Sequence, residues 1–407
     1  MRNHRIRNRQ CNLERARLIQ EAIKIMTGSD VTFIDLFAGC GGISLGLMNA
    51  GWKGIFAVEK EKNAFETLKH NLIDSKSGPC YKWPHWLQKE PIGISRLLKK
   101  YQSEIKSLKG KVDMVVGGPP CQGFSLVGKR RKNDPRNRLF IQYVEFVKLV
   151  QPRLVLMENV KGITVEFGKK KNSSIGNKRG RRAKPFADRI RKTLEEGGYE
   201  VYPSLIRAVD FGVPQIRPRY FLVGVQKPIP AGFGPLELKS AIDKLRRSFL
   251  QERKLPIERN VSTKDALSDL ETNGRAVMDC VDSPGFKQVF YGGPQSEYQR
   301  LLHGSMNGSA PNSLRLANHR QSTISRFEEI LRCCRPGVTL SDGERARLGT
   351  RKHCIVVLHP DKPSHTLTTL PDDFVHYSEP RILTVREYAR LQSFPDWFEF
   401  RGAGHQL

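Results

Sequence analysis

The chain has 407 residues, which exceeds the usual size of one compact core and predicts a large domain joined to a smaller one. Its 69 lysine and arginine residues against 41 aspartate and glutamate residues give a formal net charge of +28, which indicates a partner rich in phosphates, above all nucleic acid. No apolar run is long enough to span a bilayer and the arginine-rich N-terminus lacks the apolar part of a secretory signal, so we expect a cytoplasmic, nucleoid-associated protein without a membrane partner.

Apolar runs alternate with amphipathic stretches over residues 31–225, which is the pattern of a doubly wound parallel sheet. The predicted strands are 31–37, 55–58, 112–116, 154–157, 200–208 and 220–225. The predicted helices, in which apolar residues recur with a period near 3.6, are 61–71, 137–150 and 184–196, with a further helix from Ile43. These elements predict an α/β domain.

The remaining segments divide the chain into further parts. Residues 1–30 are a basic extension with an amphipathic helix at 13–26, and residues 168–184 are a basic loop without the apolar content of a core. Residues 226–358 are mostly irregular and rich in proline and glycine, which predicts a second, smaller domain. Residues 359–407 return to the first domain, with a helix at 384–393 capped by Thr384.

The segment FIDLFAGCGG, residues 33–42, places a strand directly before Gly39, Gly41 and Gly42. Such a turn lets a cofactor approach the backbone closely. Glu59 lies 20 residues after Gly39, at the end of the next apolar run, where a carboxylate can accept hydrogen bonds from ribose hydroxyls. The turn and the carboxylate together predict a site for a nucleoside cofactor.

The segment GGPPCQGFS, residues 117–125, follows another predicted strand, so Cys121 lies at the edge of the sheet where open α/β folds bind ligands. Two prolines fix the backbone before this thiol and Gly123 frees the backbone after it. The eight cysteines form no CxxC pair and are interpreted as reduced thiols, of which Cys121 alone sits in a setting that suggests nucleophilic chemistry.

PPCQGFS resembles the nucleophile motif of the cytosine-5 DNA methyltransferases, and further motifs of that family follow in order over residues 31–401. FIDLFAGCGG resembles the motif that binds S-adenosylmethionine (AdoMet), Glu158-Asn159-Val160 the ENV motif, and residues 215–219 (QIRPR) the QxRxR motif. RILTVREYARLQSFP, residues 381–395, is similar to the helix that supports target recognition. The resemblance implies a Rossmann-like AdoMet-dependent methyltransferase fold at 31–225 and a target-recognition domain at 226–358.

The resemblance also implies a mechanism on a flipped-out cytosine in double-stranded DNA. The thiolate of Cys121 would add to C6, Glu158 would contact N3, and Arg219 would bind O2 with Arg217 beside the thiolate or Glu158, although which arginine does which stays open. The implied AdoMet contacts are Phe37, Ala38, Gly39, Gly41, Gly42, Glu59, Pro119 and Leu139. The implied DNA contacts, in a loop over residues 122–139, are Gln122, Ser125 and Arg136.

The sequence departs from the family's pattern in two places. The family's tenth motif, which completes the AdoMet pocket, has no counterpart before Leu407, so we expect a missing C-terminal segment or a separate polypeptide, with a permuted arrangement that uses the helix at 13–26 as the alternative. The aspartate of the third motif has no counterpart near residues 91–98, which leaves the adenine contacts unassigned. Two rival functions stay open: a tRNA cytosine-5 methyltransferase, and a DNA-binding protein that has lost catalysis.

Overall fold

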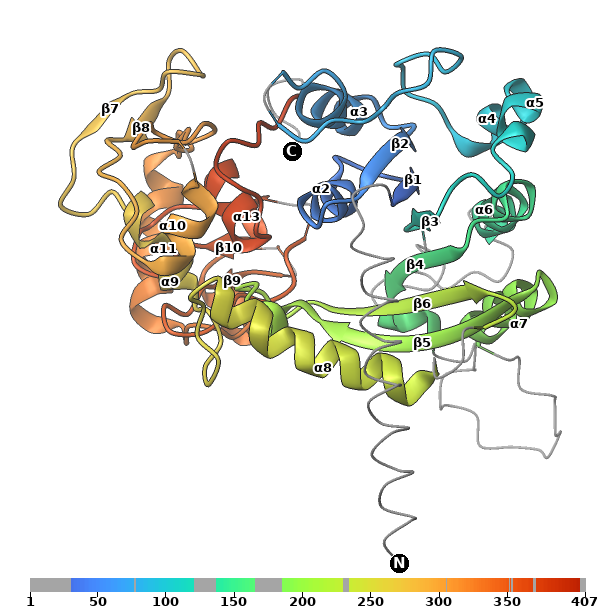
Figure 1. The fold of residues 1–407 in the computed structure, drawn as a ribbon. Helices are drawn as coiled ribbons and strands as arrows, with labels where there is room; N and C mark the ends of the chain where they lie inside the picture. Colours follow the sequence, from blue (N-terminus) through green and yellow to red (C-terminus); the bar gives the residue numbers. More distant parts are fainter. Residues whose placement is uncertain are drawn as a thin grey trace, which may run out of the picture. The chain divides into compact units, whose positions relative to one another are not determined.

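The computed structural model describes residues 31–76, 78–120, 137–164, 185–229, 234–304, 306–350, 352, 354–368 and 371–402 (Figure 1). The chain divides into two compact units. The first unit comprises Met1–Ile206 with Pro218–Ala241, and the second comprises Arg207–Arg217 with Ile242–Leu407. Residues 359–407 belong to the second unit. The return of this C-terminal segment to the catalytic domain stays a prediction.

A six-stranded sheet forms the centre of the first unit, and Figure 1 shows its strands side by side in the order β2-β1-β3-β4-β6-β5. The strands are β1 (Thr32–Leu36), β2 (Lys53–Val58), β3 (Met114–Gly117), β4 (Leu154–Val160), β5 (Tyr199–Arg207) and β6 (Pro218–Gln226). β1 pairs in parallel with β2 and β3, and β3 with β4, which confirms that part of the prediction. The prediction is wrong at β6, which runs antiparallel to β4, because an apolar run does not encode the direction of its strand.

Helices accompany this sheet, and those near residue 43, 61–71, 137–150 and 184–196 confirm predicted helices, whereas those at 94–100 and 102–107 were not predicted. The helices are α2 (Gly42–Asn49), α3 (Lys62–Leu68) with a π-helical turn at Lys69–Ile73, α4 (Ile94–Lys100), α5 (Gln102–Ser107), α6 (Asn137–Val150) and α7 (Phe186–Glu196). Ile34 and Leu36 of β1 are fully buried in one core together with side chains of α4, α6 and α7. Asp35, the residue between them, points to the other face of β1, where it bonds to Ser44 of α2.

The second unit is more regular than the sequence suggested. It contains β7 (Val277–Asp279), β8 (Lys287–Val289), β9 (Val356–Val357), β10 (Phe374–Val375), α9 (Thr263–Leu267), α10 (Glu297–His303), α11 (Gln321–Cys333), α12 (Asp342–Arg347) and α13 (Val385–Leu391). The helix α8 (Pro235–Glu252) spans the boundary of the two units, and short 3-10 helices lie at Lys161–Thr164, Ala208–Phe211, Ser268–Leu270 and Pro371–Asp373. The sequence over 226–354, rich in proline and glycine, thus contains regular elements that its pattern did not indicate.

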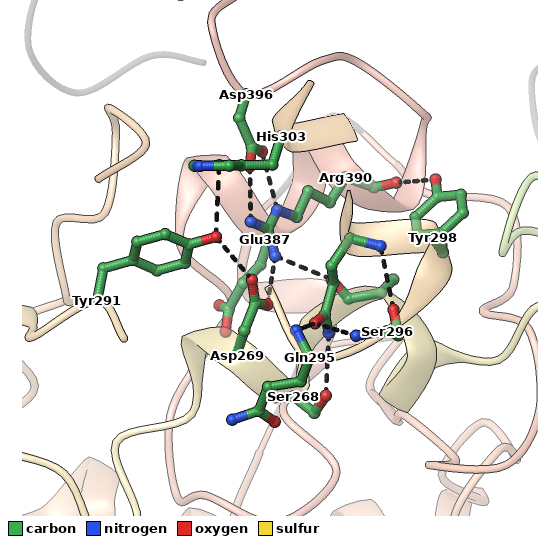
Figure 2. Close-up of polar contacts among 12 residues, drawn as sticks. Ser268, Asp269, Tyr291, Gln295, Ser296, Tyr298, His303, Glu387, Arg390 and Asp396 are labelled. Carbon is green, nitrogen blue, oxygen red and sulfur yellow. Dashed lines mark hydrogen bonds and ion pairs between the residues drawn. The ribbon is translucent and has the colours of Figure 1, made fainter. Parts of the chain in front are cut away.

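A buried polar network holds the second unit together around Arg390 of α13 (Figure 2). Its guanidinium bridges the carboxylates of Asp269 and Asp396, with Nη2 2.7 Å from Asp396 Oδ2, and all three side chains are fully buried. Tyr298 donates its hydroxyl proton to the carbonyl oxygen of Arg390 at 2.6 Å. The predicted cap of α13 is confirmed, since Thr384 accepts a hydrogen bond from the backbone of Glu387 in a capping box. Among the described residues, no helix is both long and apolar enough to cross a membrane.

Candidate cofactor and active site

The turn after β1 holds its backbone in left-handed conformations. Phe37, Gly39 and Gly41 have φ values of 64°, 57° and 94°, and Gly41 is the N-cap of α2. A Cβ added at Gly41 would lie 2.7 Å from Leu68 Cδ1, whereas one added at Gly39 would meet no heavy atom within 4 Å. Gly41 is therefore required for packing, and Gly39 leaves an open space at the turn that a ligand can approach.

Glu59 follows β2 and lies beside this turn. Its Oε2 accepts the backbone N–H of Gly39 at 2.9 Å, and its Oε1 accepts those of Lys60 and Glu61 at 2.8 Å each. A carboxylate offers about four acceptor positions, so these three bonds orient Glu59 and still leave capacity for a ribose hydroxyl. The backbone N–H of Ile92 donates to the carbonyl oxygen of Glu59 at 2.7 Å, which places the unassigned third-motif segment at the same edge. The residues of the turn therefore fit a nucleoside cofactor.

The loop after β3 is held against the end of β4. The buried side chain of Asn159 donates from Nδ2 to the carbonyl oxygen of Pro119 at 3.1 Å. A Cβ added at Gly118 would lie 3.2 Å from Glu158 Oε2, so the backbone passes this carboxylate with room for little more than a hydrogen atom. The segment that leads directly to Cys121 therefore lies beside Glu158.

Glu158 also forms an ion pair with Arg219 of β6. Arg219 Nε lies 2.7 Å from Glu158 Oε1, and the two side chains are 15% and 25% exposed respectively. In the antiparallel register Val160 lies opposite Arg219 and Phe221 lies opposite Glu158, so the two charged side chains are diagonal neighbours on one face of the sheet. The guanidinium of Arg219 and the accessible carboxylate of Glu158 thus lie together at the edge of the sheet where β3 ends.

Arg217 is the other arginine that the sequence assigned to the active site. It lies in the second unit, where its Nη1 is 3.5 Å from Oε1 of the buried Gln215. Gln215 in turn donates from Nε2 to the carbonyl oxygen of Leu391 at 3.2 Å, so the start of the QIRPR segment is attached to α13. The predicted role of Arg217 beside the thiolate or Glu158 stays a prediction.

The other predicted site residues fall into two groups. Ala38 donates its N–H to the carbonyl oxygen of Val58 at 3.0 Å, Gly42 begins α2, and Leu139 is partly buried against the main core. The predicted nucleophile Cys121 and the predicted DNA contacts lie outside the described residues; these contacts are Gln122, Ser125 and Arg136. The predicted helix at 13–26 and the predicted loop at 168–184 also lie outside them.

Several residues that organise the site were not singled out from the sequence. Asn159 anchors the loop after β3. The buried hydroxyl of Tyr143 lies within hydrogen-bond distance of two carbonyl oxygens, that of Val115 at 3.2 Å and that of Leu156 at 3.3 Å. Asp35 is buried at the end of β1, and burial raises its pKa to about 7. A polar residue inside an otherwise apolar strand was the available signal for Asp35, whereas nothing in the sequence marked Tyr143.

A sheet in which β6 runs antiparallel to β4, a glycine turn at the carboxyl edge of this sheet and a carboxylate after the next strand define an AdoMet-dependent methyltransferase fold. The model of the C-5 cytosine-specific DNA methylases matches residues 31–407, and the chain belongs to this family. It is a DNA (cytosine-5-)-methyltransferase with S-adenosyl-L-methionine as its cofactor.

Several proteins that are named Type II methyltransferases match most of the chain. The Type II methyltransferase M.DdeI of Desulfomicrobium norvegicum is 30% identical over 383 residues, which cover 91% of this chain and 80% of that protein. The Type II methyltransferase M1.HphI of Haemophilus parahaemolyticus is 30% identical over 381 residues, with the same coverage of 91% and 80%. The crystal structure of a putative DNA modification methyltransferase encoded within an Escherichia coli prophage is 25% identical, with a TM-score of 0.60, and the match covers 91% of this chain and 90% of that one. These comparisons give no support to a separate polypeptide that supplies the last motif.

Proposed function

We propose that the protein methylates C5 of one cytosine within a specific sequence of duplex DNA, as the modification enzyme of a type II restriction-modification system, through a covalent adduct with Cys121. The target atom is stacked inside the duplex, so the base has to be extruded, at a cost of roughly a few kcal/mol. The loop over residues 122–139, with Gln122, Ser125 and Arg136, is the proposed contact to the opened DNA. Residues 226–358 are the proposed target-recognition domain.

The proposed reaction proceeds in two steps at the cytosine ring. The Cys121 thiolate would form a bond to C6, and the electron pair of the C5–C6 double bond would then attack the methyl group of AdoMet, whose sulfur would keep the pair of the broken S–C bond and leave as the neutral thioether S-adenosylhomocysteine. A base next removes the proton from C5, the double bond forms again, and the thiolate leaves. Charge builds on the ring in the first step, and Glu158 at N3 with Arg219 at O2 would stabilise it.

The contact between the loop after β3 and Glu158 carries this proposal. Gly118 passes within 3.2 Å of Glu158 Oε2, measured from an added Cβ, and Asn159 fixes the next residue, Pro119. A nucleophile two residues after Pro119 therefore starts from a position adjacent to the Glu158 and Arg219 pair. This arrangement would bring a thiolate, a carboxyl group and a guanidinium to one pyrimidine ring, as addition at C6 requires.

Replacement of the nucleophile tests the mechanism. We expect Cys121→Ser to lose methyl transfer by at least about a thousandfold while duplex affinity stays within a few-fold, because the thiolate acts in chemistry. Cys80→Ser, at an exposed cysteine of the same unit, is the matched control and should keep full activity. Retained transfer in Cys121→Ser would contradict the covalent mechanism.

Two further measurements separate this function from its rivals. Duplex DNA with 5-fluorocytosine at the target should trap a covalent complex with the unaltered protein and none with Cys121→Ser, because the fluorine at C5 cannot leave as a proton does. Transfer to tRNA but not to DNA would favour the tRNA enzyme, and DNA binding without any transfer would favour a protein that has lost catalysis. Sequencing of methylated cytosines in cellular DNA would then identify the target.

A further inference from the structure

A carboxyl group that the proposed reaction does not use is buried directly beneath the glycine turn. Asp35 is the fourth residue of β1 and only 1% exposed. Its Oδ2 accepts the hydroxyl proton of Ser44 at 2.5 Å, and the same Ser44 oxygen accepts the hydroxyl proton of Tyr81 at 2.5 Å. Its Oδ1 is buried as well and has no hydrogen-bond partner among the described residues.

This environment favours the neutral carboxyl group. An ionised carboxylate would leave an unpaired anionic oxygen in the core, which costs far more than an unpaired neutral one. The groups that face Asp35 are Ser44 of α2, Glu59 after β2, Tyr81 and Tyr143 of α6, and no described cation is among them. Burial is the main reason that the pKa of Asp35 is raised to about 7, with the charge of Glu59 acting in the same direction.

The position of Asp35 couples this proton to the cofactor turn. Ser44, its partner, is in the first turn of α2, whose N-cap Gly41 closes the glycine turn. Glu59 accepts the backbone N–H of Gly39 in the same turn, and its negative charge disfavours the ionisation of Asp35. A charge that arrives at this edge of the sheet therefore acts on Asp35 through a buried region, where screening by solvent is weak.

We propose that Asp35 is a positioning residue that holds a proton while the methyl donor is absent and releases it when the sulfonium cation of AdoMet occupies the turn. The demethylated product, S-adenosylhomocysteine, has a neutral thioether in place of the sulfonium, so Asp35 takes its proton back after transfer. Ionised Asp35 attracts the cationic donor and has no such interaction with the product. The buried carboxyl group thereby makes the site prefer donor over product.

The direction of the pH dependence follows from this exchange. An opposite charge nearby favours the ionised form, so the donor complex gives up the proton at a lower pH than the free protein does. The affinity for AdoMet should therefore rise as pH increases towards about 7 and level off above it, whereas the affinity for S-adenosylhomocysteine should not follow this rise. At pH 6.5 the amino and carboxyl groups of both ligands are almost fully ionised, so their own titrations contribute little to the comparison.

Calorimetry at pH 6.5 in two buffers with different ionisation enthalpies tests the proposal on the full chain. We expect AdoMet to release a fraction of a proton more than S-adenosylhomocysteine does. Asp35→Asn should bind the product as the unaltered protein does, lose about tenfold of its preference for the donor, which corresponds to one pKa unit of coupling, and release no extra proton. Asp74→Asn, at an exposed carboxylate paired with Lys89, is the matched control and should change nothing.

The outcomes are decisive without relying on any single variant. Equal proton release by both ligands with the unaltered protein would overturn the proposal, even if Asp35→Asn failed to fold. Donor-specific release that persists in Asp35→Asn would assign the proton to another group and would overturn it too. Because the readouts are ligand binding and proton release, they do not depend on the covalent mechanism proposed for Cys121.

Discussion

The ion pair of Glu158 and Arg219 joins a carboxylate and a guanidinium at a site that ligand can still reach. Both side chains keep some exposure, and pairs of this kind contribute only about 0 to 1 kcal/mol to folding. Their position at the end of β4, next to Gly118, matters more for chemistry than for stability. The pair holds Glu158 in one orientation before the base arrives, so that little reorganisation is needed in the reaction.

This interpretation predicts a kinetic defect in Glu158→Gln without a folding defect. The amide cannot supply a proton at N3, so methyl transfer should fall by about 10²- to 10⁴-fold, as for other losses of general acid–base catalysis. AdoMet affinity and the melting temperature should change little. Glu145→Gln, on the exposed side of α6, is the control. Single-turnover methyl transfer measures the effect, and activity close to that of the control would rule out a role for Glu158 in chemistry.

His376 provides a prediction about stability and pH in the second unit. Its side chain is fully buried, and burial together with the charge of Arg381 lowers its pKa to about 4 from an ordinary value of 6.5. The unfolded chain therefore takes up this proton at a higher pH than the folded chain does. Stability is fully present above about pH 6.5 and falls as pH decreases towards 4, by about 3 kcal/mol in total.

Urea unfolding between pH 4.5 and 7.5 measures this dependence. The lowered pKa values of the buried Glu379 and Glu387 affect stability mainly at a more acidic pH. Asp35, whose pKa is raised to about 7, acts in the opposite direction over this window in the unaltered protein and in the variant alike, so the difference between their two curves isolates the contribution of the histidine. His376→Gln should remove the loss of stability that the histidine causes towards pH 4.5, whereas His85→Gln, at an exposed histidine of the other unit, should leave the curve unchanged. Identical curves for His376→Gln and the unaltered protein would assign the effect elsewhere.

At the scale of elements, the conformation of the glycine turn depends more on Gly41 than on its other residues. Gly41→Ala would combine a left-handed φ of 94° with a Cβ 2.7 Å from Leu68 Cδ1, so the turn or α3 has to shift. We expect AdoMet affinity to fall at least tenfold, because the turn is displaced from the cofactor. Gly46→Ala is the matched control within α2, since its Cβ meets no atom within 4 Å. It should keep the affinity and stabilise the helix by about 0.5 to 1 kcal/mol. Equilibrium binding and thermal unfolding of both variants decide the matter, and equal affinities would contradict the role of Gly41.

The central strands could be predicted from the sequence because burial on both faces leaves a continuous apolar run. β1 to β4 all appear as such runs, and the structure confirms them within a few residues. The direction of β6 could not be predicted, because the same residues fit a parallel or an antiparallel neighbour. α8 was missed because glycine and proline at 230–235 dominate its start, although its own 18 residues are amphipathic.

The site was predictable where its residues are close in sequence and less so where the fold brings them together. The turn at Gly39 and the carboxylate of Glu59 form a local pattern, and the structure joins them through one hydrogen bond. Arg390 and Asp269 are 121 residues apart in the sequence, and no local pattern in the sequence predicts that they form a pair. Asp35 was overlooked for a related reason, since its significance depends on what surrounds it in the core.

At the scale of the whole molecule, 69 basic residues stand against 41 acidic ones, so ion pairs within the chain cannot neutralise the net charge of +28. Paired arginines such as Arg390 and Arg381 are balanced within the second unit and contribute nothing to a distant phosphate. The excess is carried by the remaining lysines and arginines, which are distributed over the whole length of the chain. A surface of this kind attracts any duplex, so discrimination between sequences has to come from base contacts.

The affinity for a duplex without the target sequence should consequently fall steeply with salt. Each neutralised phosphate releases condensed counterions, with a slope of about −0.9 per contact in a plot of log affinity against log salt concentration. We expect a slope of about −5 or steeper between 50 and 200 mM salt, and a shallower slope for single strands of equal length, where each contact contributes about −0.7. AdoMet, a small ligand with one net positive charge, provides the internal control, because its affinity should change little over the same range. Fluorescence anisotropy with labelled duplexes measures the slope. A flat salt dependence for duplex DNA would mean that the excess charge is not used on phosphates and that the basic surface has another partner.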